Sequence, residues 1–280
     1  MPWPAAHGFG PSRVWHDGLV SQPTLAVEVV RAASRRLIGT VDSLAGDSWT
    51  RPSSLPGWSI AHVVAHLALN AEAIAGAVAG VTRGERVPQY PSFEARTAGI
   101  EELAARGAAV IRGRLLESGG VFEAAVLALP AGLGGAAIEL IRGSGRTYPV
   151  GAAVITRERE VEIHHADIGA SLDVGYGPAD WPAEFTVRLL DHLTQRYAGP
   201  GFRAVAADLG RSWEFGAPEG RPGTGAPGQG ASGRGAPGPG GETVTGTGHE
   251  IAWWATGRPP YPGTTGPVSD TGALPALGGI

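Results

Sequence analysis

One long stretch of this chain, from Gly216 to Gly241, cannot form part of a packed core. It contains 11 glycines and 5 prolines in 26 residues, and no apolar side chain larger than alanine or proline. Such a stretch cannot offset its loss of conformational entropy by burying apolar surface. We therefore predict a disordered insert over residues 216–241, and a second disordered segment over residues 1–20.

Between these two segments, apolar side chains recur at the spacing of α-helices. The repeats predict a short helix near 121–129 and four long helices, at residues 23–44, 60–80, 94–117 and about 150–168. Ser59 has the side chain and the position of an N-cap for the second long helix, and Pro149 suits the first turn of the fourth. Four long helices in succession predict an up-down bundle over residues 21–172.

The residues after the bundle have a different pattern, which predicts a small α/β domain over residues 178–280. The expected elements are a helix, two strands joined by a turn at Gly210, a strand after the insert and a last helix, at residues 182–197, 202–209, 211–215, 242–247 and 249–256. The fold class predicted for the whole chain is therefore α+β, with a helical bundle first and a small mixed domain second.

Composition excludes several classes of function. The chain has no cysteine, so it offers no disulfide, no cysteine zinc site and no thiol nucleophile of its own. All 22 basic residues are arginines, and the net charge of −4 argues against nucleic acid or an anionic membrane as a partner. The first 25 residues lack the pattern of a signal peptide, and the longest apolar run, 124–138, is too short to cross a bilayer. We expect a cytoplasmic protein.

Polar side chains gather on one face of the fourth long helix. At about 100° per residue, Glu160, His164 and Asp167 fall within about 60° of one another, beside an apolar stripe. Glu160 and His164 are four residues apart and can both reach one metal ion, and carboxylate and imidazole are standard zinc ligands. The alternative is a solvated helix with ion pairs between residues four apart. Glu158 and Glu162 point the other way, so we expect their side chains to be solvated.

The second long helix carries histidines in a similar setting. His62 and His66 are four residues apart, and Asn70 follows one turn later. One of these histidines, together with Glu160 and His164, would complete a His/Glu/His set on two facing helices. Three protein ligands leave a fourth position open, as in a catalytic zinc site. The alternative is a pair of surface histidines or of hydrogen-bonded core histidines.

Three segments resemble the signatures of one known family, the mycothiol-dependent maleylpyruvate isomerases. They occur in the family's order and are LPGWSIAHVVAHL at 55–67, REREVEIHHADI at 157–168 and AWWATGR at 252–258. The family shares its N-terminal bundle with the DinB-like metalloenzymes. The resemblance therefore implies a DinB-like four-helix bundle followed by a small C-terminal α/β domain.

The resemblance also implies functional residues. It implies a zinc ion, or another divalent metal, bound by His66, Glu160 and His164. It implies that Arg258 faces the active site and helps to bind the carboxylates of the substrate. Asp167 lies one turn beyond His164, and we expect it either to orient a metal ligand or to act as a general acid–base.

The activity implied by the resemblance is the cis–trans isomerisation of maleylpyruvate with mycothiol as cofactor. A thiolate that adds to the double bond, allows rotation and leaves again suits this reaction, and a chain without cysteine must take its thiol from outside. Zinc would keep the sulfur deprotonated near neutral pH. We predict that His62 and Asn70, on the same helix as His66, lie in the cofactor-binding part of the site.

Two other functions remain open. One is a mycothiol S-transferase that conjugates electrophiles for detoxification, and the other is a non-catalytic protein that binds a metal or a ligand. A thiol-consumption assay separates the isomerase from the S-transferase, because an isomerase regenerates its thiol and a transferase does not. The expected partners are a small-molecule substrate and the thiol, with no nucleic acid and no membrane, and the protein is expected to be a monomer or a homodimer.

Overall fold

The computed structural model of the chain describes residues 23–172, 174–216 and 241–277. The two segments predicted to be disordered, 1–20 and 216–241, lie almost entirely outside these ranges, so those predictions stay open. The described residues form two compact units that divide after Gly177, a helical unit and a C-terminal unit.

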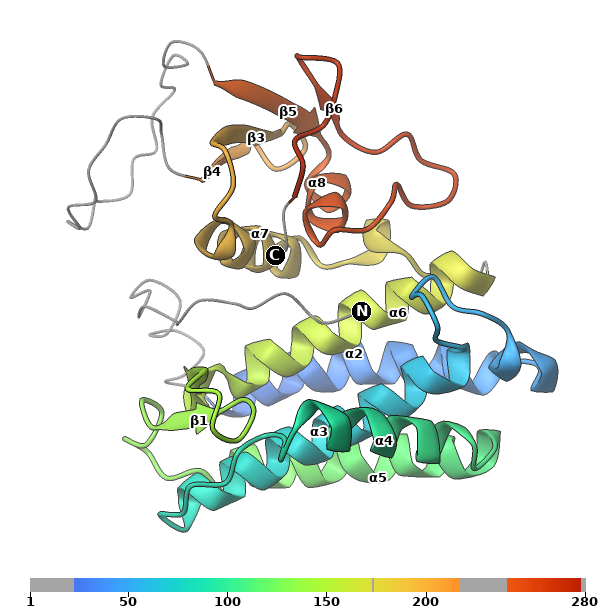
Figure 1. Cartoon of the computed structure of the whole chain (residues 1–280), viewed down its shortest axis with the longest axis vertical. Helices are drawn as coiled ribbons and strands as arrows, with labels where there is room; N and C mark the ends of the chain where they lie inside the picture. The colour runs from blue at the N-terminus through green and yellow to red at the C-terminus, as the bar shows by residue number, and fades with distance from the viewer. Residues whose placement is uncertain (1–22, 173, 217–240, 278–280) are drawn as a thin grey trace. The chain divides into compact units, whose positions relative to one another are not determined.

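The helical unit is a bundle of four long helices. They are α2 (Pro23–Ser43), α3 (Ile60–Thr82), α5 (Ala108–Leu127) and α6 (Ala153–Leu172). Both α2 and α3 contact α5 and α6, and the four helices lie alongside one another in Figure 1. The predicted α+β class, with a helical bundle first, is confirmed.

Shorter elements connect the long helices, and several were not predicted. A helix, α4, packs on α3, and an antiparallel two-stranded hairpin precedes α6. The connecting elements are η1 (Gly46–Thr50), α4 (Phe93–Ala104), β1 (Ala137–Glu139), β2 (Thr147–Pro149) and η2 (Val150–Ala152). The one-turn η2 directly precedes α6, so the fourth long helix begins slightly later than predicted.

The predicted third helix, 94–117, is wrong, because the chain forms two helices there. α4 ends at Ala104, and α5 runs without interruption from Ala108 through the region where a separate short helix was expected. The break is at Gly107, whose φ of 84° and ψ of 158° lie in a region that is essentially restricted to glycine. Apolar residues continue on both sides of this glycine, so periodicity alone did not reveal the change of direction.

α3 is the central helix of the bundle. Most of its side chains are small or branched apolar groups, and most of its residues are buried. Ser59 caps it as predicted: the Ser59 side chain accepts from the backbone N–H of His62, and the His62 side chain accepts from the backbone N–H of Ser59. Among the described residues α3 alone has the length and apolar composition to cross a membrane, and 72% of its apolar window is buried inside the protein.

The C-terminal unit is a four-stranded sheet with two helices. The strand order is β4-β3-β5-β6, and only the central pair, β3 and β5, is parallel. Both helices lie on the same side of the sheet in Figure 1. The elements are η3 (Pro178–Asp180), α7 (Ala183–Arg196), β3 (Phe202–Ala206), β4 (Arg211–Phe215), β5 (Glu242–Gly246), α8 (Gly248–Ala255) and β6 (Val268–Ser269). All but η3 and β6 match predicted elements.

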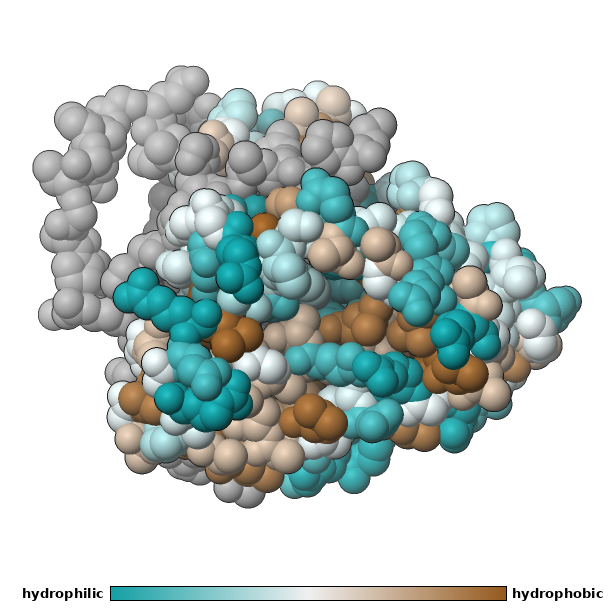
Figure 2. All heavy atoms as spheres, turned by 60° about the horizontal axis from the view of Figure 1, so that its bottom comes forward, coloured by the Kyte–Doolittle hydropathy of each residue, from teal (hydrophilic) through white to brown (hydrophobic). Residues whose placement is uncertain are grey.

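The outer surface of the bundle keeps some large apolar side chains exposed. On α4 and α5 these are Phe93, Val110, Leu116, Val121 and Leu127. Figure 2 shows hydrophobic atoms in several groups among hydrophilic ones on the face that it presents. Scattered exposed apolar residues of this kind are normal on a folded protein.

Candidate metal centre

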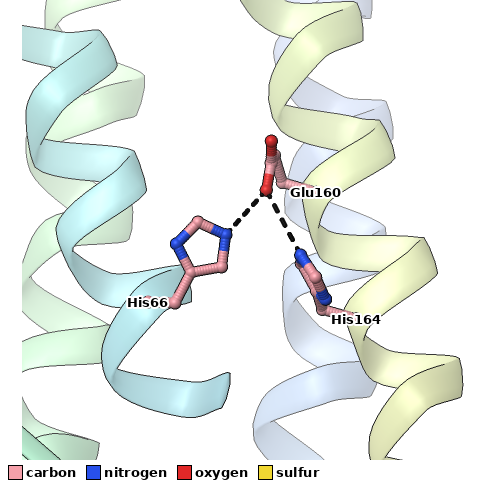
Figure 3. Close-up of side chains that lie close together, drawn as sticks. All are labelled: His66, Glu160 and His164. Atoms are coloured by element: carbon pink, nitrogen blue, oxygen red, sulfur yellow. Dashed lines mark hydrogen bonds and ion pairs between the residues drawn. The ribbon is translucent and has the colours of Figure 1, made fainter. Parts of the chain in front are cut away.

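Three side chains meet between α3 and α6. His66 comes from α3, and Glu160 and His164 come from successive turns of α6 (Figure 3). Glu160 Oε2 lies 2.9 Å from His66 Nε2 and 3.5 Å from His164 Nε2. One ligand atom from each residue lies within 4.8 Å of the other two. The structure therefore brings together the His/Glu/His set that the sequence predicted, and of its two candidate histidines on α3 the one in the set is His66.

The three groups differ in exposure and in charge. His66 is buried, whereas the side chains of Glu160 and His164 are 29% and 16% exposed. Burial lowers the pKa of His66 to about 4, against the opposing hydrogen bond to Glu160. Burial also opposes the ionisation of Glu160, but hydrogen bonds from His164 and His66 hold its pKa well below the ordinary value. At neutral pH the cluster thus contains a carboxylate and a neutral imidazole.

Asp167 fixes the orientation of His164. Its Oδ2 lies 2.8 Å from His164 Nδ1, and its side chain is fully buried. Burial opposes the charged form of His164, but the hydrogen bonds to Asp167 and Glu160 raise its pKa above the ordinary value. The Asp167 carboxylate accepts a hydrogen bond from His164 Nδ1–H. The other ring nitrogen, Nε2, is therefore directed at the cluster, as in many metal-binding histidines. Ser54 Oγ also donates to Asp167 Oδ1, at 3.2 Å.

The donor set fits a zinc ion. Two imidazole nitrogens and one carboxylate oxygen are typical ligands of catalytic zinc, and all three can approach a common point here. The hydrogen bond between Asp167 and His164 is the kind of support that such ligands have in known sites. His66, Glu160 and His164 are the residues that would hold the ion.

His62 and Asn70, predicted to bind the cofactor, lie outside the three-residue cluster. His62 is close to Ser59 through Nδ1, and its Nε2 lies 2.9 Å from Glu101 Oε2. Asn70 is buried, where it donates to Tyr90 Oη at 3.3 Å and accepts from Arg157 Nη1 at 2.9 Å. Both side chains thus have protein partners.

Arg258 belongs to the C-terminal unit and follows α8, which ends at Ala255. Its guanidinium lies over the Trp253 ring, 5.2 Å from the ring centroid. The expectation that Arg258 faces the cluster concerns the arrangement of the two units and stays a prediction.

Two arginines near the cluster were not among the predicted site residues. Arg96, from α4, places Nη2 3.1 Å from His66 Nδ1. Arg157 is 2% exposed, and burial lowers its pKa to about 10, so it stays charged at neutral pH. Arg157 was visible as a basic residue three positions before Glu160, but its burial depends on α3. Arg96 has no sequence signal, because its contact depends on how α4 packs.

The expectation that Glu158 and Glu162 are solvated is wrong. They are only 2% and 1% exposed, because α2 covers that side of α6. Glu162 pairs with Arg36 of α2 and accepts a hydrogen bond from Tyr176. The spacing of the residues along α6 correctly separates its two faces. It does not show that other helices, α2 and α3, pack against both of them.

The fold and the site together define a class of protein: a four-helix bundle with a His/Glu/His cluster on two facing helices, followed by a small α/β unit. The chain belongs to the mycothiol maleylpyruvate isomerase N-terminal domain family, whose model matches residues 30–169, half of the chain. The resemblance seen in the sequence is thereby confirmed.

Two solved structures share the fold. One is the mycothiol-dependent maleylpyruvate isomerase, with 23% sequence identity and a TM-score of 0.72, covering 90% of this chain and 95% of that chain. The other is a histidine-to-alanine mutant of the mycothiol-dependent maleylpyruvate isomerase, with 22% identity and the same TM-score and coverage. No curated protein matches the sequence significantly.

Proposed function

We propose that this protein is a zinc- and mycothiol-dependent cis–trans isomerase of the maleylpyruvate isomerase type, acting in the cytoplasm. The observation that carries the proposal is the approach of His66, Glu160 and His164 to within 4.8 Å of one another in a member of this family. The structural relative is a mycothiol-dependent maleylpyruvate isomerase, and this supports mycothiol as the thiol and maleylpyruvate as the class of substrate.

The chemistry agrees with the composition of the chain. Isomerisation needs a thiolate that adds to one carbon of a conjugated double bond, permits rotation about the resulting single bond and then leaves. The chain has no cysteine, so the thiol comes from a small molecule. A zinc ion held by His66, Glu160 and His164 would supply a positive charge that lowers the pKa of a nearby thiol.

The residues of the chain have separate roles in this proposal. His66, Glu160 and His164 hold the ion, and Asp167 keeps His164 in position through the Nδ1 contact of 2.8 Å. Arg258 binds a carboxylate of the substrate, because a guanidinium forms paired hydrogen bonds with a carboxylate. The partners are the thiol and a small-molecule substrate.

The first test is metal content, measured by elemental mass spectrometry on tag-free protein purified without chelator. We expect about one zinc per chain, and a roughly 100-fold or greater loss of zinc affinity in Glu160→Gln, because a charged ligand is lost. Glu102→Gln is the control, since Glu102 lies on α4 and its side chain is 78% exposed. Zinc affinity that is equal in E160Q and in the wild type contradicts the ligand set.

The second test separates the isomerase from an S-transferase that uses the same site. Thiol concentration is followed during turnover of an unsaturated dicarboxylate substrate. An isomerase leaves the thiol concentration unchanged while the double bond changes geometry. Stoichiometric loss of thiol contradicts the isomerase and supports the transferase.

A further inference from the structure

The two histidines of the cluster have opposite hydrogen-bond surroundings. His164 faces an acceptor at Nδ1, the carboxylate of Asp167 at 2.8 Å. His66 faces a donor at Nδ1, because the Arg96 guanidinium, 3.1 Å away, has only N–H groups to offer. The remaining nitrogen of His66, Nε2, lies 2.9 Å from the carboxylate of Glu160.

These contacts fix the proton of His66. A neutral imidazole carries one N–H, and the nitrogen that accepts from an arginine cannot carry it. The proton therefore lies on Nε2, where it is donated to Glu160. This is the tautomer that cannot bind a metal through Nε2, because the lone pair needed for the metal bond is absent.

Metal binding at Nε2 reverses this arrangement. The ring proton must then lie on Nδ1, where it would face a donor of Arg96 at 3.1 Å. Two donors cannot form a hydrogen bond with each other, so the guanidinium has to leave Nδ1. Arg96 and the metal thus compete for His66 although they contact opposite edges of its ring.

The surroundings of Arg96 suit a group that can change its partner. The guanidinium lies 5.8 Å from the ring centroid of Trp58 and 5.6 Å from that of Tyr90, so its contact with His66 is one of three that hold it. Arg96 is partly exposed, and none of the ion pairs formed by the described residues includes it. Arg157, buried nearby against Asn70, adds a second positive charge.

We propose that Arg96 couples metal occupancy to anion binding: metal at His66 Nε2 releases the Arg96 guanidinium, which then binds a carboxylate of the incoming ligand. The inference rests on the proposed metal site and adds Arg96 to the residues that act there. Coupling of this kind is reciprocal, so a carboxylate held by Arg96 strengthens metal binding by the same factor.

Zinc affinity tests the competition. Zinc is titrated into the metal-free full-length protein against a fluorescent chelator. Arg96→Met keeps an apolar stem between the aromatic rings and removes the donor, so we expect zinc to bind roughly tenfold more tightly. Arg106→Met is the matched control, since the Arg106 side chain is 62% exposed, and its zinc affinity should equal that of the wild type. Unchanged or weaker zinc binding in R96M contradicts the proposal.

The tautomer of His66 gives a readout that a general loss of positive charge would not change. In nitrogen-15 NMR spectra of the metal-free wild type we expect the His66 proton on Nε2, and in the zinc-loaded protein on Nδ1. Arg96→Gln offers an amide oxygen as acceptor, so its metal-free form should shift toward Nδ1–H. A metal-free wild type with the proton already on Nδ1 contradicts the proposal.

Maleate, a small dicarboxylate, tests the anion-binding half by calorimetry on the zinc-loaded protein. We expect its affinity to fall about tenfold in R96M and to stay unchanged in R106M. Equal maleate affinity in R96M and in the wild type contradicts the coupling while leaving the proposed enzyme intact. A wild-type protein that takes up no zinc at all contradicts both.

Discussion

Single neighbours decide what each histidine of this protein can do. His164 is held by a carboxylate, His66 is held by a guanidinium, and His165, next in sequence to His164, faces the other side of α6. The stacking of the His165 ring on Tyr176, with centroids 3.6 Å apart, belongs to packing between α6 and the segment after it. The pKa of His164 is raised by its hydrogen bonds to carboxylates, whereas burial lowers the pKa of both His66 and His165.

Asp167 should control zinc affinity through His164. In Asp167→Asn the charge that favours the Nδ1 proton is lost, so we expect zinc affinity to fall about tenfold. The measurement is the same chelator competition. Ser171→Ala is the control, because the Ser171 hydroxyl donates to the backbone oxygen of Asp167 and not to the carboxylate that bonds His164. Unaltered affinity in D167N would show that position alone, and not charge, orients His164.

His165 should make the protein sensitive to acid. Burial, followed by the charge of Arg36, lowers the pKa of His165 to about 3, while an unfolded histidine has a pKa near 6.5. Below about pH 6.5 the unfolded state therefore binds a proton that the folded state does not, so the free energy of unfolding falls as the pH falls toward about 3.

Replacing His165 removes this proton. Relative to the wild type, the stability of His165→Gln should improve by ~1.4 kcal/mol for each unit that the pH falls between about 5.5 and 4. Urea unfolding of the metal-free proteins at several pH values measures this difference. A difference that is constant with pH contradicts the assignment of the proton to His165.

At the scale of elements, the sequence predicts what is local. The apolar periodicity of α2, α3 and α6, the Ser59 cap and the spacing of Glu160 and His164 all depend on neighbours within one helix. The burial of Glu162 and the contact of Arg96 with His66 depend on other elements. Those features were not predicted, because one helix carries no information about what covers it.

Two glycines of the same region should respond in opposite ways to alanine. Gly107→Ala should destabilise the protein by about 1–3 kcal/mol, because its φ of 84° is unfavourable for a residue with a Cβ. Gly113 lies inside α5 with nothing within 4 Å of an added Cβ, so Gly113→Ala should stabilise it by about 0.5–1 kcal/mol. Thermal or urea unfolding measures both. Similar effects in the two variants would show that the break at Gly107 is not needed.

At the scale of the whole molecule, the sheet of the C-terminal unit explains how a long insert can interrupt it. Phe215, at the end of β4, and Glu242, at the start of β5, both pair with Phe202 of β3, one on each side. They are therefore two strand spacings apart, or roughly 10 Å. A connection of a few residues suffices to join them.

Replacing residues 217–240 by a five-residue Gly/Ser linker should leave the fold intact. Because loop-closure entropy changes slowly with length, we expect the free energy of unfolding to rise by about 1 kcal/mol. Urea unfolding measures this, and zinc content should stay the same. A loss of stability beyond about 2 kcal/mol would show that the segment packs against the rest of the protein, contrary to the predicted disorder.

The contacts between α2 and α6 affect the positions of Glu160 and His164, which lie on the other side of α6. Glu162 pairs with Arg36, and His165 contacts Thr40, so α6 is fixed along its axis by residues that are not metal-ligand candidates. A slip of one turn, about 5.4 Å, would leave these buried groups unpaired. The small side chains of α3 can pack against α6 in more than one position along the helix axis, so they do not by themselves determine that position. The positions of Glu160 and His164 along α6 are therefore set by packing against α2 and do not require a bound ion.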